Sequence, residues 1–146
     1  MSRPSWSRLL PLLVVALAWG CASPEERFAE HVARGEEFAE RGQAAEALIE
    51  YRSALKAQPQ NADINYRIAY LLQGEFALED AAFYYREAYR LDPDRIEAAM
   101  NEARLMLFSD PERSDEIIAE GMLKAPDHSM VHTTRSERGL TKNDTR

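Results

Sequence analysis

The stretch GQAAEALIEYRSALKAQPQN, residues 42–61, returns in altered form as EDAAFYYREAYRLDPD, residues 79–94. Pro59 and Pro93 stand 34 residues apart, and Pro126 follows 33 residues later. Counting back from each proline, small residues recur at one offset (Ala54, Ala88, Gly121) and large ones at another (Tyr51, Tyr85, Ile118). A repeat of this length predicts a solenoid of stacked supersecondary units.

The apolar residues of each copy predict an amphipathic helix, because they fall at i, i+4, i+7 and i+8. The stripe consists of Ala47, Tyr51, Ala54 and Leu55 in the first copy and of Ala81, Tyr85, Ala88 and Tyr89 in the second. Each proline follows its stripe and ends the helix. Gly42 and Gly74 are expected to mark turns between paired helices. No segment alternates with period two, so the sequence predicts an all-α fold without a sheet.

This pattern resembles the tetratricopeptide repeat (TPR), which carries small residues at repeat positions 8, 20 and 27, an aromatic at 24 and a proline at 32. The resemblance implies a solenoid of antiparallel helix pairs with repeats at 28–61, 62–95 and 96–128. The third repeat is degenerate, because Ser114 and Gly121 replace alanines and one residue is missing. Residues 129–146 fit either a partial fourth repeat of a longer array or a polar capping helix.

The small residues of the repeat are expected where two helices approach closely. Position 8 is filled by Gly35, Ala69, Ala103 and Ser136. His31 stands where the family usually has a large apolar residue, so it is expected to pack between helices. Three acidic groups are interpreted as solvated helix faces: Glu36-Glu37, Glu46 with Glu50, and Asp115-Glu116.

The resemblance also implies a concave groove lined by the first helix of each repeat. The family's ligand-facing positions correspond here to Val32, Glu36, Glu40, Asp63, Tyr66, Arg67, Tyr70, Gln73, Glu97, Met100, Asn101, Arg104, Leu107 and Phe108. The candidate partner-binding residues among them are Tyr66, Arg67, Tyr70, Asn101, Arg104 and Phe108. Aromatic and arginine side chains supply most of the binding energy at interfaces, so this lining suits an extended or helical peptide. Met100, Leu107 and Phe108 fit core packing equally well.

The N-terminal twenty residues have the layout of an export signal. Arg3 and Arg8 precede an apolar run, LLPLLVVALA at residues 9–18, which is too short to span a bilayer. The junction that follows, Ala18-Trp19-Gly20-Cys21, resembles a bacterial lipobox, although Trp19 and Ala18 depart from its usual residues. The resemblance implies lipidation of Cys21, with residues 21–27 forming a short tether. Cleavage by an ordinary signal peptidase, and a free thiol at Cys21, remain alternatives.

Charge and composition restrict the classes of partner. Without Arg3 and Arg8, 16 basic residues face 25 acidic ones, for a net charge of −9. Such a surface disfavours nucleic acid and anionic headgroups, so any contact with a membrane has to come from the lipid anchor. Because Cys21 is the only cysteine, neither an internal disulfide nor a thiolate metal site can form.

An enzymatic function finds little support in the sequence. His128 and His132 stand at i, i+4, but no convincing third metal ligand or general base accompanies them. No phosphate loop, nucleophile elbow or pair of inward carboxylates is present. We therefore expect no enzyme activity, no cofactor and no bound metal.

These observations predict a non-catalytic interaction scaffold, anchored by lipid in a bacterial cell envelope. Ala22 after the cysteine resembles lipoproteins sorted to the outer membrane, so the domain is expected on its periplasmic face. Two narrower functions stay open. One is a pilotin-like assembly factor for a secretin or pilus; the other is the N-terminal part of a longer TPR lipoprotein of exopolysaccharide and exosortase (PEP-CTERM) systems. The sequence does not specify an oligomeric state.

Overall fold

The computed structural model describes residues 23–139; the predicted export signal, Cys21 with its predicted lipidation, and residues 140–146 lie outside this part of the chain. Seven helices and no strand occur within the described residues. They are α2 (Pro24–Glu40), α3 (Ala44–Ala57), α4 (Ala62–Gly74), α5 (Leu78–Leu91), α6 (Ile96–Met106), α7 (Pro111–Lys124) and α8 (Ser129–Glu137). The predicted all-α fold is confirmed.

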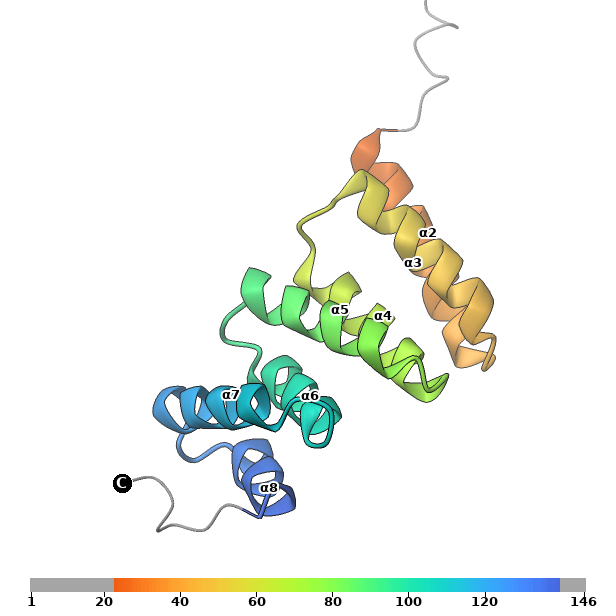
Figure 1. Ribbon diagram of the computed structural model, residues 1–146. Coiled ribbons are helices and arrows are strands. Elements are labelled where there is room, and N and C mark those ends of the chain that lie inside the picture. The colour runs from red at the N-terminus through yellow and green to blue at the C-terminus, as the bar shows by residue number, and fades with distance from the viewer. Residues whose placement is uncertain (1–22, 140–146) are drawn as a thin grey trace, which may run out of the picture.

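The helices stack as pairs along one direction, from α2 and α3 at one end to α8 at the other (Figure 1). The extensive contacts are those within the pairs α2–α3, α4–α5 and α6–α7, and those that join α3 to α4 and α5 to α6. Helix α8 packs on both α6 and α7. Each unit therefore contacts mainly its neighbours, as expected of a solenoid.

The predicted stripes lie in the core. Ala47, Ala54, Ala81 and Ala88 are fully buried, together with the rings of Tyr51 and Tyr85. One apolar cluster extends from α3 to the start of α6, and a second joins α6, α7 and α8. Tyr89 packs against both clusters, so the apolar interior continues along the stack.

Helix ends follow local capping rules. Ser23 and Glu26 form a capping box at the start of α2, with bonds of 3.1 Å from the Glu26 N–H to Ser23 Oγ and 2.8 Å from the Ser23 N–H to Glu26 Oε2. Asn61 caps α4 by accepting the N–H of Ile64. As the stripes predict, Pro59, Pro93 and Pro126 lie just beyond the ends of α3, α5 and α7.

The turns inside the first two pairs share one hydrogen-bond pattern but not one residue type. Gly42 has φ +73°, and the following N–H, from Gln43, bonds to the Phe38 carbonyl at 2.9 Å. In the second pair Phe76 has φ +60°, and the N–H of Ala77 bonds to Leu72 at 2.9 Å. This arrangement is a Schellman helix end, whose left-handed residue is usually glycine. The prediction that Gly74 marks this turn was wrong, since Gly74 is the last residue of α4.

All three acidic groups interpreted as solvated faces contain a residue that pairs with another helix or its end. Glu36 on α2 lies 2.9 Å from Arg67 Nη1 on α4. Glu50 on α3 lies 2.7 Å from His31 Nδ1 and 3.2 Å from Arg34 Nε, both on α2. Asp115 on α7 pairs with Arg138 at 2.8 Å. His31 accordingly forms a polar contact between helices, where packing alone was expected. Helical periodicity alone shows no neighbouring helix, so these pairings needed the tertiary arrangement.

Glu102 is a charged residue in the core. Its side chain is 1% exposed, and its Oε1 accepts a hydrogen bond from Arg86 Nε on α5 at 2.7 Å. Arg113 Nε on α7 lies 3.9 Å from the same oxygen. A buried carboxylate requires such partners, because burial removes its hydration. Glu102 thereby connects α6 to both adjacent helices.

Candidate functional site

Three of the predicted binding residues surround one pocket of about 360 Å³ where α2, α3 and α4 meet. Tyr66, Arg67 and Tyr70 come from α4, and the opposite wall contains Ala39 and Tyr51. Tyr66 and Tyr70 lie four residues apart and therefore on the same face of α4. The pocket thus presents aromatic surface beside one cationic group.

The Tyr66 ring is held on three sides. It packs edge-on against Tyr85 with ring centroids 5.4 Å apart, and the Arg95 guanidinium lies 5.3 Å above its centroid. Its hydroxyl accepts a hydrogen bond from Asn101 Nδ2 at 3.4 Å. A side chain fixed in this way loses little conformational entropy when a ligand binds.

Arg67 is oriented by two carboxylates. Its Nε donates to Asp63 at 2.6 Å, one turn earlier on α4, and its Nη1 lies 2.9 Å from Glu36 Oε1 on α2. Partial burial alone would lower the pKa of the guanidinium, but hydrogen bonds to Asp63 and Tyr51 outweigh this effect and raise that pKa. Arg67 therefore stays charged, and its ion pair with Glu36 connects α4 to α2 beside the pocket.

Tyr70 differs from its neighbours because 66% of the residue is exposed. It lines the same pocket, and its exposed surface is open to a ligand. An exposed aromatic ring next to a half-buried one offers apolar area with a polar tip, which is typical of interface anchors.

The other three candidate residues have different surroundings. Asn101 is buried on α6 and reaches the pocket only through its bond to Tyr66. Arg104 pairs with Glu137 on α8 at 2.8 Å. Phe108 is 95% exposed and lines a separate pocket with Leu78 and Phe83. Of the residues whose position was ambiguous, Met100 is fully buried in the core.

The sequence did not indicate several residues of this site. Tyr51 lines the pocket from α3, although its place in the repeat stripe suggested a purely core position. Arg95, which covers Tyr66, lies between α5 and α6, outside any periodic segment. The 34-residue spacing allows Tyr51 to be placed near α4, but no sequence signal identifies Arg95.

His128 and His132, at the start of α8, have different surroundings. His128 Nε2 lies 3.2 Å from Glu97 Oε1, while His132 is exposed. Residues 23–139 contain no group of three or more His, Cys, Asp or Glu side chains arranged to hold a metal. None of the helices in this range is long and apolar enough to cross a bilayer.

No protein-family model matches the sequence, and no curated protein does. Solved structures do resemble the fold. The second TPR domain of human RPAP3, determined in complex with an HSP70 peptide, aligns with a TM-score of 0.71 and 18% identity over 82% of this chain and 100% of that one. The TPR domain of Arabidopsis OM64 aligns with a TM-score of 0.69 and 13% identity, over 80% of this chain and 98% of that one.

A third similar structure is YrrB, described as a TPR protein with an unusual peptide-binding site. It aligns with a TM-score of 0.63 and 17% identity, over 83% of this chain and 61% of that one. At such low identity the likeness establishes the fold and nothing finer. The described residues therefore form an all-α TPR solenoid.

Proposed function

We propose that this chain is a non-catalytic scaffold that binds a peptide or protein segment along α4 and its neighbouring helices. The observation that carries the proposal is the pocket in which exposed Tyr70 stands beside Tyr66 and Arg67, both held in place by neighbouring side chains. Rigid aromatic and arginine groups at a concave surface are the usual anchors of a protein interface.

The similar structures support a peptide as the ligand class. The RPAP3 domain was determined with a bound HSP70 peptide, and YrrB has a peptide-binding site. The electrostatics of this pocket favour a mixed ligand, because Arg67 is already paired with Asp63 and Glu36. We infer that apolar and aromatic ligand side chains contact the tyrosines, while polar groups bond to Arg67 and its carboxylate partners.

We further propose that the domain acts at a membrane of the bacterial envelope, anchored by lipid on Cys21, within an export or assembly machine. The support for this is the sequence around the single cysteine, where a basic and apolar leader ends in Ala18-Trp19-Gly20-Cys21. Helix α2 begins at Pro24, so few residues separate that cysteine from the folded domain.

Affinity capture from solubilised membranes tests the pocket. We expect Tyr70→Ala and Arg67→Ala each to reduce recovery of the captured partner by about tenfold or more, the range of an interface hot spot. Ile49→Ala is the matched control, since Ile49 on α3 is 63% exposed and does not line the pocket. A partner recovered equally with all three variants would show that it binds elsewhere.

A further inference from the structure

Phe76 has a conformation that its side chain disfavours. Its φ of +60° lies in the left-handed region, where the equivalent turn of the first pair has Gly42. Burial of the ring does not offset the cost of this conformation, because Phe76 is 86% exposed. A bulky residue kept in this region while largely exposed suggests a role outside the fold of the single chain.

Three further apolar side chains extend the surface of Phe76. Leu78, Phe83 and Phe108 are 42%, 52% and 95% exposed, and all three line a cavity of about 420 Å³ between α5 and the end of α6. Leu78 also lines the adjoining pocket with Phe76. We name Phe76, Leu78, Phe83 and Phe108 the apolar edge. It shares no lining residue with the pocket of Tyr66 and Tyr70.

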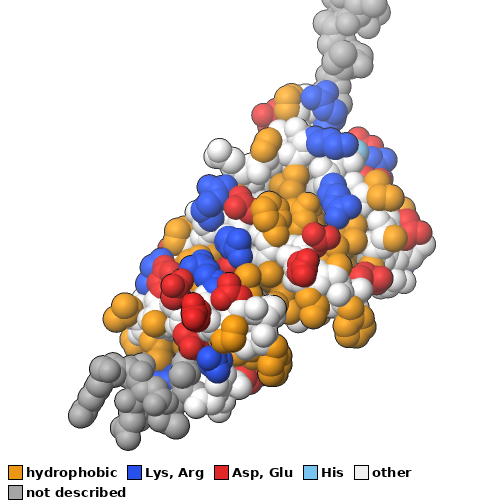
Figure 2. Space-filling view, in the orientation of Figure 1, with side chains coloured by type: hydrophobic (Ala, Val, Ile, Leu, Met, Phe, Trp, Pro, Cys, Tyr) orange, Lys and Arg blue, Asp and Glu red, His pale blue; other side chains and the backbone are white. Residues whose placement is uncertain are grey.

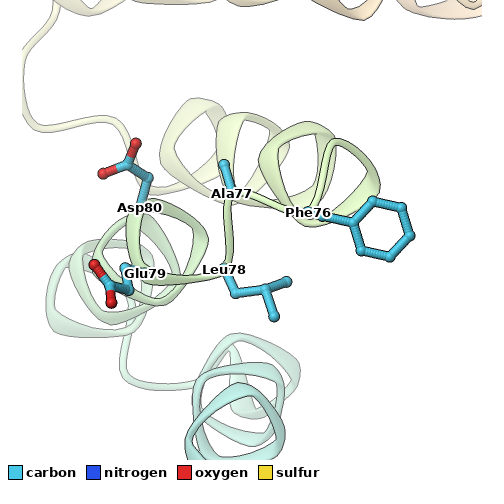
Figure 3. Close-up of a pocket in the computed structure, with 5 residues that line it drawn as sticks. All are labelled: Phe76, Ala77, Leu78, Glu79 and Asp80. Atoms are coloured by element: carbon cyan, nitrogen blue, oxygen red, sulfur yellow. The ribbon is translucent and has the colours of Figure 1, made fainter. Parts of the chain in front are cut away.

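The figures show how this surface is exposed. Hydrophobic side chains gather at the edge of the molecule where the α4–α5 and α6–α7 turns lie (Figures 1 and 2). Close up, the Phe76 ring points away from the helices and Leu78 points toward the following helix pair, while Glu79 and Asp80 lie on the other side of the loop (Figure 3). The apolar edge therefore has an acidic flank.

The charges beside the apolar edge are unbalanced. Glu75, Glu79 and Asp80 are exposed, and none of them forms an ion pair with another residue in the 23–139 range. The cation lining the same cavity, Arg86, is already paired with Glu102 at 2.7 Å. The net field at this edge is therefore negative and attracts cations.

We propose that the apolar edge docks a cationic amphipathic segment of a protein partner, with aliphatic or aromatic side chains in the cavity and Lys or Arg against Glu75, Glu79 and Asp80. This interaction is separate from peptide binding at Tyr70. The same carboxylates argue against an anionic membrane surface and against a second copy of this acidic chain, because both would bring like charges together.

The test measures binding of a fluorescent helical peptide of leucine and lysine to the immobilised full-length chain. Phe76→Gly and Phe108→Ala are each expected to weaken its affinity by about tenfold. Leu123→Ala, which removes an 86% exposed side chain on α7, is expected to leave the affinity unchanged. Phe76→Gly retains a residue suited to the turn, so a loss of binding in that variant cannot be attributed to unfolding.

Charge is tested with matched triple variants. Glu75→Gln/Glu79→Gln/Asp80→Asn should lower the affinity for the leucine and lysine peptide by about tenfold and reduce the salt dependence of binding. Glu25→Gln/Glu46→Gln/Asp127→Asn removes the same number of negative charges at exposed positions elsewhere, and it should change the affinity for this peptide far less. A peptide of leucine and glutamate with the same pattern should not bind. Equal affinity for the two peptides, or for the two triple variants, would overturn the proposal.

Further measurements would detect a membrane or a second copy of this chain bound at the apolar edge. Binding to vesicles of phosphatidylglycerol and phosphatidylethanolamine that Phe76→Gly abolishes would assign the apolar edge to a membrane and refute a protein partner. A dimer in sedimentation velocity that Phe108→Ala dissociates would assign it to a second copy. Loss of capture by Tyr70→Ala tests the other pocket, so the two proposals can fail independently.

Discussion

A β-carbon at position 35 would lie 2.5 Å from Cε1 and 2.6 Å from Cδ1 of Tyr51. No real contact is this short, and the buried tyrosine ring cannot yield as a flexible chain could. Gly35→Ala should gain about 1 kcal/mol of helix propensity but lose about 2–3 kcal/mol to overpacking. We expect a net loss of about 1–2 kcal/mol in the free energy of unfolding, measured by urea denaturation.

Gly121→Ala is the matched comparison. There the β-carbon would meet the terminal methyl of Met100 at 2.7 Å, and methionine can change rotamer to move away. The loss should therefore be smaller, within about 0.5 kcal/mol of the original protein. Equal losses in the two variants would contradict the explanation based on the rigidity of Tyr51.

The pair formed by Glu102 and Arg86 predicts an asymmetric result. Arg86→Ala leaves the Glu102 carboxylate buried with Arg113 at 3.9 Å as its remaining cation, so we expect a loss of about 3 kcal/mol. Arg86→Ala/Glu102→Leu should recover most of it, because no unpaired charge is left in the core. Urea denaturation of both variants measures these losses. A double variant as unstable as Arg86→Ala would show that the unpaired Glu102 carboxylate is not the cause of the loss.

Tyr85 should make stability sensitive to alkaline pH. Burial raises the pKa of its phenol, and the nearby Tyr66 and Tyr70 add to the rise. A group with a folded pKa above its unfolded value of about 10 stabilises the fold fully below that pH, and this contribution is lost as pH rises toward the folded pKa. The free energy of unfolding should therefore fall above about pH 10, by up to about 1.4 kcal/mol per pH unit.

Tyr85→Phe separates this effect from the other titrating groups. The variant loses the 2.9 Å hydrogen bond to Gln73, which costs about 1 kcal/mol at every pH, but it has no phenol to ionise. Its unfolding free energy should decline less steeply between about pH 10 and 11. Parallel curves for the two proteins would show that Tyr85 does not cause the decline.

Phe76→Gly should stabilise the isolated chain. The left-handed conformation costs a residue with a β-carbon about 1–2 kcal/mol, whereas glycine adopts it freely but loses more entropy on folding. We expect a net gain of about 0.5–1 kcal/mol by thermal or urea denaturation. A loss would indicate that Phe76 makes a stabilising contact that its exposure conceals.

The proposed anchor is tested at Cys21. In cells labelled with a palmitate analogue, the original chain should incorporate label and fractionate with membranes, since two or more acyl chains bind a bilayer stably. Cys21→Ser should lose both properties. Membrane fractionation that persists in the unlabelled variant would point to retention of the apolar segment, residues 9–18, as the anchor.

Much of the fold could be predicted because repetition makes local signals redundant. Ala47 and Ala81 occupy the same place in successive stripes, so a prediction that one is buried supports the same prediction for the other, and both are buried. The site was less predictable. Tyr66, Arg67 and Tyr70 were identified together because a single helix presents them. Phe108 lines a different pocket from these three, because α6 ends at Met106, two residues before it.

The sequence by itself determined the stacked helix pairs, their stripes and the ends of α3, α5 and α7, since period, small residues and prolines act within one repeat. Only the tertiary structure decided which charges are paired and which apolar groups stay exposed. Glu102 and Glu75 are the same type of residue, yet Glu102 is buried between arginines and Glu75 is exposed beside Phe76 without an ion pair to any described residue. That difference depends on contacts between residues distant in the chain, which no local pattern encodes.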